Sequence, residues 1–312
     1  MIQYIIKRFF MMILTVLLIA TLTFFLMHSI PGSPFDEDRT SNPTIQENLE
    51  KYYKLDQPLP VQYVNYLKAI VMFDFGPSIK KPNESVNNLL ARGFPISFEL
   101  GIVTILVAVL SGVTLGTLAA LRHNGIIDYL AMAFAVVGIS VPNFILATLL
   151  IQVFAGQLGW LPAATWQSPL HMILPTLALA TGPMAIIARL TRSSMLEVMT
   201  QDYIKMARAK GLKPSRIIIR HALRNAMMPI VTIMGTMLAG ILTGTFVIER
   251  IFAIPGMGKY FVESISNRDY PVIMGSTVFY STFLIFMLFL VDIVYGILDP
   301  RIKLHKKEGE SS

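Results

Sequence analysis

The chain has 312 residues, of which 54% are hydrophobic and 14% are charged, and its formal net charge is +7 at pH 7. An average soluble domain is about 25% charged, so this composition and the clustering of the apolar residues exclude a pair of soluble domains. The chain contains no cysteine, which excludes disulfides, thiolate metal sites and a cysteine nucleophile. Its five histidines are scattered and show no metal-binding spacing.

The first long apolar run covers residues 9–30 and follows the basic pair Lys7 and Arg8. A helix of that length reaches about 33 Å, which is enough to cross a hydrocarbon core of about 30 Å. A signal peptide also begins with a basic segment and an apolar run, but this run is longer and lacks an Ala-x-Ala cleavage site. We therefore interpret residues 1–30 as an uncleaved N-terminal span.

The next segment, residues 31–97, contains seven Lys or Arg and eight Asp or Glu residues and is nearly neutral. Long loops escape the bias that keeps basic residues in the cytoplasm. Proline and glycine turns divide the segment into short amphipathic stretches, of which residues 61–73 are one. The sequence predicts a small helical cap on the extracytoplasmic side.

Five further runs are long and apolar enough to cross a membrane, at about 98–121, 127–154, 170–190, 228–248 and 272–296. Each must be helical, because an open strand could not satisfy its backbone groups in lipid. Prolines inside these runs should kink or break their helices, at Pro142, Pro175 and Pro183. The predicted fold is all-α, a polytopic membrane protein with six transmembrane helices, a membrane core at 98–296 and a tail at 297–312.

Two pairs of glycines lie four residues apart inside the predicted spans, Gly112 with Gly116 and Gly240 with Gly244. Each pair places small residues on one face of a helix and allows a second helix to approach closely. They predict helix packing and nothing more specific.

Basic residues concentrate between Arg189 and Met227, where nine Lys or Arg are opposed only by Glu197 and Asp202. Basic residues beside membrane spans favour the cytoplasmic side. The loop 191–227 is therefore expected in the cytoplasm, and with six spans both termini lie there too.

Within this loop, Gly211 suits the residue after a helix end and Pro214 the first turn of the next helix, which predicts two short helices. On the second helix a basic stripe recurs every four residues, at Arg216, Arg220 and Arg224. Apolar residues occupy the neighbouring face, at Ile218, Ile219, Ala222, Leu223 and Ala226. The pattern fits a helix at the membrane surface with arginines among lipid headgroups, and equally a docking surface for a soluble partner.

The spacing of Ala207, Gly211 and Leu223 resembles the cytoplasmic coupling motif of ABC-importer permeases. The departures from the general motif fall at Lys205, Met206, His221 and Arg224, and with the stretches ARAKG and RHALRNAMMP they resemble the dipeptide, oligopeptide and nickel branch. Two more stretches resemble that branch, LDQPLPVQYVNYL followed by DFGPS, and the segment from Phe246 to Ile273. The resemblance covers roughly residues 1–300 and implies the type I importer permease fold.

The resemblance implies the permease subunit of an ATP-driven importer in a bacterial or archaeal cell membrane. Oligopeptides are the first cargo that it suggests, with dipeptides, nickel chelates or related solutes as alternatives. Its partners would be a homologous second permease in a heterodimer, two cytoplasmic ABC ATPases, an extracytoplasmic peptide-binding protein and membrane lipid, without nucleic acid. The ATPase-coupling residues would be Asp202, Tyr203, Ala207, Arg208, Ala209, Lys210, Gly211, Arg216, Arg220 and Arg224.

The chain itself is not expected to be an enzyme or to bind a cofactor or metal. The stretch PGMGKY at 255–260 is similar to the end of a phosphate-binding loop, but Ala253 and Tyr260 stand where that motif needs Gly and Ser or Thr. ATP with Mg²⁺ would therefore be used by the partner subunits.

The predicted spans contain almost no ionisable residues, so a translocation pathway would be lined by neutral groups. Such groups suit peptide backbone, which offers neutral donors and acceptors, whereas hydrogen bonding between helices is the alternative role for each. The candidate lining residues are Ser140, Asn143, Thr236, Thr243, Ser276 and Tyr280. A secondary transporter would instead need an internal repeat and a midplane ion site, and the sequence shows neither.

Overall fold

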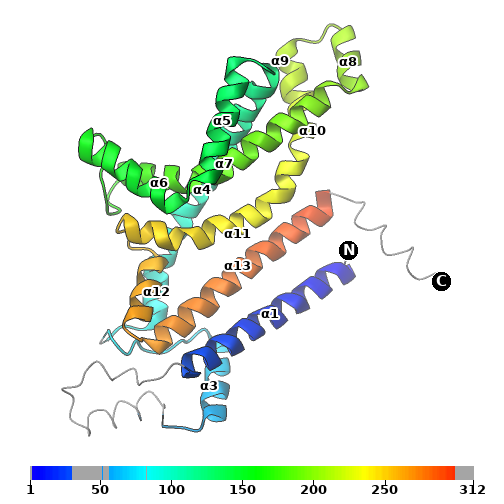
Figure 1. The fold of residues 1–312 in the computed structure, drawn as a ribbon. Helices are drawn as coiled ribbons and strands as arrows, with labels where there is room; N and C mark the ends of the chain where they lie inside the picture. The colour runs from blue at the N-terminus through cyan, green and yellow to red at the C-terminus, as the bar shows by residue number, and fades with distance from the viewer. Residues whose placement is uncertain (1, 30–50, 52–55, 82, 299–312) are drawn as a thin grey trace. The chain divides into compact units, whose positions relative to one another are not determined.

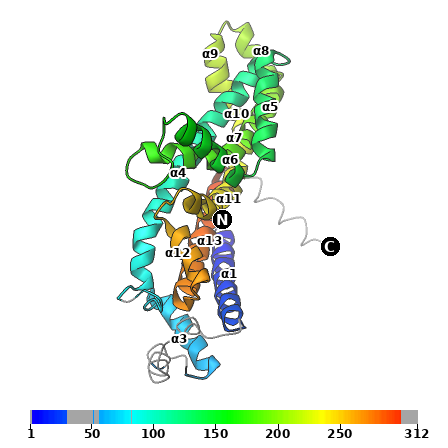
Figure 2. The same ribbon diagram turned by 60° about the vertical axis from the view of Figure 1, so that its left-hand side comes forward.

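The computed structural model describes residues 2–29, 51, 56–81 and 83–298. Much of the predicted cap and the tail from residue 299 lie outside the described residues. The chain divides into two compact units, residues 1–95 with 256–312 and residues 96–255, whose elements are labelled in Figures 1 and 2. The described residues form helices and no strands, which confirms the all-α prediction.

The helices of the first unit are α1 (Ile2–Ser29), α3 (Leu59–Met72), α12 (Met257–Ser266) and α13 (Tyr270–Leu298). Helix α4 (Val86–Leu121) begins in this unit and continues into the second. The second unit continues with α5 (Ile126–Ser140), α6 (Asn143–Leu150), the π-helix η1 (Ile151–Gln157) and α7 (Leu170–Met199). It ends with α8 (Asp202–Ala209), α9 (Pro214–Arg216), the π-helix η2 (Ile217–Leu223), α10 (Arg224–Ala226) and α11 (Met228–Ile251).

Four helical segments are long and apolar enough to cross a membrane, and there are up to six spans if each of two bent pairs counts as one. The four are Tyr4–Ser29, Val86–Leu121, Leu170–Met199 and Tyr270–Ile293. The bent pairs are Ile126–Ser140 with Asn143–Gln157, at 107°, and Pro214–Ala226 with Met228–Leu238, at 52°. The predicted span near 127–154 thus corresponds to a broken segment, whereas the predicted span near 228–248 lies within the continuous helix α11 and the second bend falls just before it.

Proline acts differently in the two helices where breaks were predicted. The chain ends α5 at Ser140 and begins α6 after Pro142, with Val141 extended as the residue before a proline prefers. Pro175 and Pro183, in contrast, lie inside α7, which continues through both. Of the predicted kinks or breaks, a break is therefore confirmed at Pro142, and α7 is continuous at Pro175 and Pro183. Pro175 is buried and Pro183 partly buried, so neighbouring packing holds α7 together where each proline removes a backbone hydrogen bond.

In the first unit, α1 and α13 lie side by side and run in opposite directions (Figure 1). Near the beginning of α1, Arg8 forms an ion pair of 3.0 Å with Asp292 of α13. Near its end, Met27 packs with Tyr270 and Ile273. The beginning of α1 and the end of α13 therefore lie at the same end of this pair.

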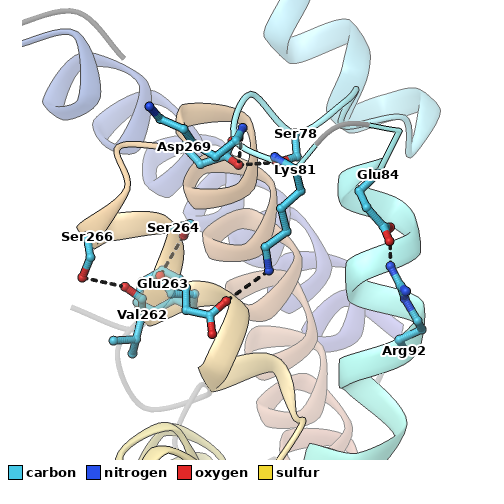
Figure 3. Close-up of polar contacts among 11 residues, drawn as sticks. Ser78, Lys81, Glu84, Arg92, Val262, Glu263, Ser264, Ser266 and Asp269 are labelled. Carbon is cyan, nitrogen blue, oxygen red and sulfur yellow. Dashed lines mark hydrogen bonds and ion pairs between the residues drawn. The ribbon is translucent and has the colours of Figure 1, made fainter. Parts of the chain in front are cut away.

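A buried carboxylate ties the segment after α3 to the turn between α12 and α13 (Figure 3). Asp269 accepts hydrogen bonds from the Ser78 hydroxyl and from the backbone amides of Ile79, at 3.2 Å, and Lys80, at 3.3 Å. Lys81 adds an ion pair of 3.1 Å to Glu263 of α12. One side chain thus satisfies three donors from a segment about 190 residues away in sequence.

We expect Asp269→Ala to destabilise this unit by about 2–4 kcal/mol, because it removes the carboxylate that accepts from the buried Ser78 hydroxyl and from two partly buried amides. The melting temperature of the purified protein in detergent would measure the loss. The matched control is Glu84→Ala, which removes the exposed ion pair with Arg92 that Figure 3 also shows. Exposed pairs contribute little, so the control should melt as the wild type does. Equal melting temperatures for both variants would contradict this role of Asp269.

In the second unit, one of the two glycine pairs is a helix contact. A Cβ atom on Gly112 would lie 2.8 Å from Ile187, and one on Gly116 would lie 2.3 Å from the carbonyl oxygen of Ala188. Helices α4 and α7 therefore approach at these glycines, as the sequence predicts. The prediction was wrong at Gly240, where an added Cβ would meet no atom within 4 Å, because this residue opens onto a cavity.

Candidate functional site

The basic loop folds into a compact helical element at the end of α7, which we call the coupling element, residues 202–226 (Figure 1). Its first helix, α8, ends at Ala209, and Gly211 takes the left-handed position after the helix end as predicted, with a φ of +73°. The amide of Gly211 bonds to the carbonyl of Arg208 at 2.9 Å, and that of Leu212 to Ala207 at 3.3 Å. This pair of hydrogen bonds is the Schellman motif, which needs a left-handed residue at the position that Gly211 occupies.

Pro214 begins the second helical segment, also as predicted. The segment then widens into the π-helix η2, so its buried residues do not follow the α-helical spacing. Ile217 and Ala222, five residues apart, are buried, whereas Ile219 is 67% exposed. Of the predicted apolar face, Ala222 and Ala226 are therefore buried against the protein and Ile219 is exposed.

The inward face of the coupling element packs against the end of α7. Ile204, Ala207, Ile217, Ala222 and Ala226 form one buried cluster with Met195 and with Ala120 of α4. Asn225 also donates a hydrogen bond of 2.8 Å to the Tyr203 hydroxyl, which joins α10 to α8. These contacts make the element a body fixed to α7.

The outward face carries most of the predicted coupling residues. Nine of the ten are exposed: Asp202, Tyr203, Arg208, Ala209, Lys210, Gly211, Arg216, Arg220 and Arg224. The tenth, Ala207, is buried and contributes to packing rather than to the surface. Lys205 pairs with Asp202 at 2.9 Å. The surface that remains is basic and presented by short, connected helices.

A buried ion pair beside this element does not follow from the sequence pattern. The Asp128 side chain, at the start of α5, is 3% exposed and accepts hydrogen bonds from Arg192 of α7, one of them at 2.7 Å. The backbone amide of Asn124 donates to the same carboxylate at 2.9 Å, and His123 lies within 3.3 Å of it. Arg192, counted among the free basic residues of the loop, is thus neutralised and connects α7 to α5.

A cavity of about 490 Å³ in the second unit brings together two predicted pathway residues, Asn143 of α6 and Thr236 of α11. Ten apolar, glycine or proline residues complete its lining: Ile139, Leu179, Gly182, Pro183, Ile186, Leu190, Ile233, Met237, Gly240 and Ile241. None of these is ionisable, so the cavity has the neutral character that the sequence predicts for a pathway.

The other candidate lining residues lie elsewhere. Ser140 is exposed and donates to the carbonyl of Val136 at 2.8 Å. Ser276, in the first unit, is buried and bonds to carbonyls of its own helix, and Tyr280 on the same helix is half-buried. The side chain of Thr243 lies outside the described residues. Only Asn143 and Thr236 therefore share a cavity among the described residues.

Two family models match the chain. Residues 112–304 match the binding-protein-dependent transport system inner membrane component, and residues 1–101 match the N-terminal model of the same membrane component. The chain belongs to this family. It is a multi-pass protein of the cell membrane.

Relatives match over their whole length. The chain is 69% identical to the dipeptide transport system permease protein DppB of Bacillus subtilis over 307 residues, which are 98% of this chain and 100% of the relative. It is 44% identical to the oligopeptide transport system permease protein OppB of Haemophilus influenzae over 305 residues, 97% of this chain and 100% of the relative.

Solved structures confirm the type I permease fold. An inward-facing MetNI methionine ABC transporter matches with a TM-score of 0.52 and 20% identity, covering 67% of this chain and 94% of that chain. An amino acid ABC transporter crystallised with histidines matches with a TM-score of 0.50, 17% identity and coverage of 68% and 94%. At this level of identity the likeness extends to the fold alone.

Proposed function

We propose that the chain is one of two permease subunits of an ATP-driven ABC importer for short peptides, with dipeptides as its main cargo. The 69% identity to a dipeptide permease over both full lengths carries this proposal. Relatives near 40% identity are named for either cargo, so identity at that level does not separate the two. The motif resemblance alone put oligopeptides first, and the 69% relative favours dipeptides instead.

The coupling element is the part of the chain that would meet the ATPases. Its inward face is fixed to α7 and α4, and its outward face is basic and exposed. A rigid element of this kind can pass a displacement to the helices that it is packed against. We infer that one ATPase docks on this outward face and that the second ATPase docks on the homologous permease. Both docking faces, and both termini of this chain, would then lie in the cytoplasm.

An extracytoplasmic binding protein would deliver the peptide, and the neutral cavity would form part of its route. Thr236 and Asn143 offer hydrogen bonds without a charge, so a peptide could pass without being held. Because the lining contains no carboxylate relay, energy would come from ATP hydrolysed by the partner ATPases.

The route can be tested by filling the cavity. Thr236→Phe should strongly reduce uptake while ATP hydrolysis continues, because the added ring occupies the space and leaves the coupling element intact. Thr236→Val keeps the side-chain shape, removes the hydroxyl and should retain most uptake. The measurements are peptide uptake and ATP hydrolysis by the complete transporter in vesicles. Normal uptake by Thr236→Phe would remove this cavity from the route.

The cargo can be tested with a peptide-length series. Vesicles containing the transporter and its cognate binding protein would take up a labelled dipeptide in competition with unlabelled peptides of two to five residues. We expect the dipeptide to compete best and the pentapeptide hardly at all. Equal or better competition by the pentapeptide would assign the chain to oligopeptide uptake.

A further inference from the structure

Helix α3 is too short to span a membrane, yet it lies against a helix that does. Its 14 residues, Leu59–Met72, reach about 21 Å, whereas a hydrocarbon core is about 30 Å thick. Figures 1 and 2 place α3 beside the C-terminal end of α1, which contains the candidate span Tyr4–Ser29.

Hydrogen bonds fix the depth of α3 along α1. The Tyr63 hydroxyl bonds to that of Thr21 at 2.8 Å, and Gln62 bonds to the His28 ring at 3.1 Å. Thr21 precedes the end of α1 at Ser29 by about 12 Å. Tyr63 therefore lies at a level that the apolar part of α1 still occupies.

The outward face of α3 is not the one expected for a helix in water. Its exposed residues are apolar apart from Lys68, with Val71 82% and Met72 78% exposed. Its inward side mixes polar and apolar residues, of which Gln62, Asn65 and Tyr66 line a cavity of about 490 Å³. A surface helix of a soluble domain turns its apolar stripe inward and its polar residues outward.

The cavity provides a second observation. The Tyr66 hydroxyl is buried there and has no hydrogen-bond partner among the described residues. A buried hydroxyl without a partner costs free energy, so the inward side of α3 leaves a polar group unsatisfied among the described residues. Burial also raises the pKa of the Tyr66 phenol, which keeps the group neutral.

We propose that α3 lies in the plane of the membrane, in the leaflet that contains the C-terminal end of α1, with its exposed apolar face against lipid acyl chains. That face consists of Val61, Val64, Val71 and Met72, with Lys68 among them and Phe73 directly after the helix. Phe25 of α1, itself 52% exposed, stacks on Tyr63 of α3, so exposed apolar residues of the two helices adjoin near this end of α1.

The composition of the face favours lipid over a soluble partner. The only charged residue of α3 is Lys68, whose long side chain can reach the headgroups while its stem stays in the apolar region. A helix with an apolar outer face of this kind inserts about 5–10 Å into the boundary between headgroups and acyl chains. The α3 part of the predicted extracytoplasmic cap would then lie in the membrane boundary.

The absence of cysteine makes this proposal directly testable. Single cysteines at Val64 and Val71 would carry a nitroxide label in the complete transporter, reconstituted in lipid nanodiscs. Electron paramagnetic resonance then compares the accessibility of each label to oxygen, which concentrates in lipid, and to a water-soluble nickel chelate. Leu22→Cys is the lipid-facing control, and Asn88→Cys, on the exposed start of α4, is the water-facing control.

We expect both α3 labels to behave like the label at Leu22, with an oxygen-to-nickel ratio several-fold above that at Asn88. Ratios like that at Asn88 would overturn the proposal. The proposal would also be overturned if the nickel chelate reaches the α3 labels in the transporter alone and no longer reaches them when the soluble binding protein is added. That result would indicate a protein docking face. None of these outcomes depends on the cargo or on ATP, so the proposed function stands or falls separately.

Discussion

Gly211→Val is expected to remove most peptide uptake while leaving the protein in the membrane at nearly normal abundance. The residue has a φ of +73°, and an added Cβ would meet no atom within 4 Å. The substitution therefore acts through the backbone alone, at a cost of about 1–3 kcal/mol. That cost is local, but it disrupts the Schellman motif that sets the angle between α8 and the segment that begins at Pro214. Under the proposed function, docking of an ATPase depends on that angle.

Two control variants separate geometry from general damage. Gly159→Val places the same side chain at another left-handed glycine with open space, outside the coupling element. It should reduce stability to a similar degree and keep uptake. Gly211→Asn should restore much of the uptake, since Asn tolerates the left-handed conformation. The measurements are membrane abundance, co-purification with the ATPases and uptake. Normal uptake by Gly211→Val at normal abundance would show that the coupling element does not dock an ATPase.

Arg192→Leu is expected to produce a large loss of stability. It removes the charged partner of Asp128, whose side chain is 3% exposed, and an unpaired buried charge costs about 3–5 kcal/mol. The hydrogen bond from the amide of Asn124 remains, so we expect the lower end of that range. The variant should accumulate poorly and melt at a lower temperature in detergent.

The double variant Arg192→Leu with Asp128→Leu tests the cause. If the unpaired carboxylate is responsible, removal of the second charge should recover part of the stability, because apolar replacements of a buried ion pair are often neutral. A double-mutant cycle on melting temperature and abundance gives the coupling between the two residues. Additive losses would show that Asp128 and Arg192 act independently.

Features set by a few neighbouring residues could be predicted from the sequence. Gly211 and Pro214 define a helix end and a helix start through their own backbone preferences, and the structure has both. Pro142 breaks its helix for the same local reason. Gly112 and Gly116 predict a close helix contact from their spacing alone, and α7 is the helix that makes it.

Features that depend on distant residues could not be predicted. Asp128 and Arg192 are 64 positions apart, and Ser78 and Asp269 are 191 apart, so no local pattern connects either pair. The π-helix η2 buries Ile217 and Ala222, which lie five residues apart, and a periodicity of about 3.6 residues per turn does not predict that spacing. Ser276 and Thr236 are both hydroxyl residues inside predicted spans, yet only Thr236 lines the cavity of the second unit, whereas Ser276 bonds to its own helix.

The most direct test of the account is peptide accumulation in vesicles that contain this chain with its second permease and ATPases, in the absence of any ion gradient. ATP would be supplied only on the side that exposes the coupling element, and the binding protein with a labelled dipeptide only on the other side. The account predicts accumulation that requires ATP and is lost in Gly211→Val. Accumulation driven by a proton gradient in vesicles that contain this chain alone would contradict it.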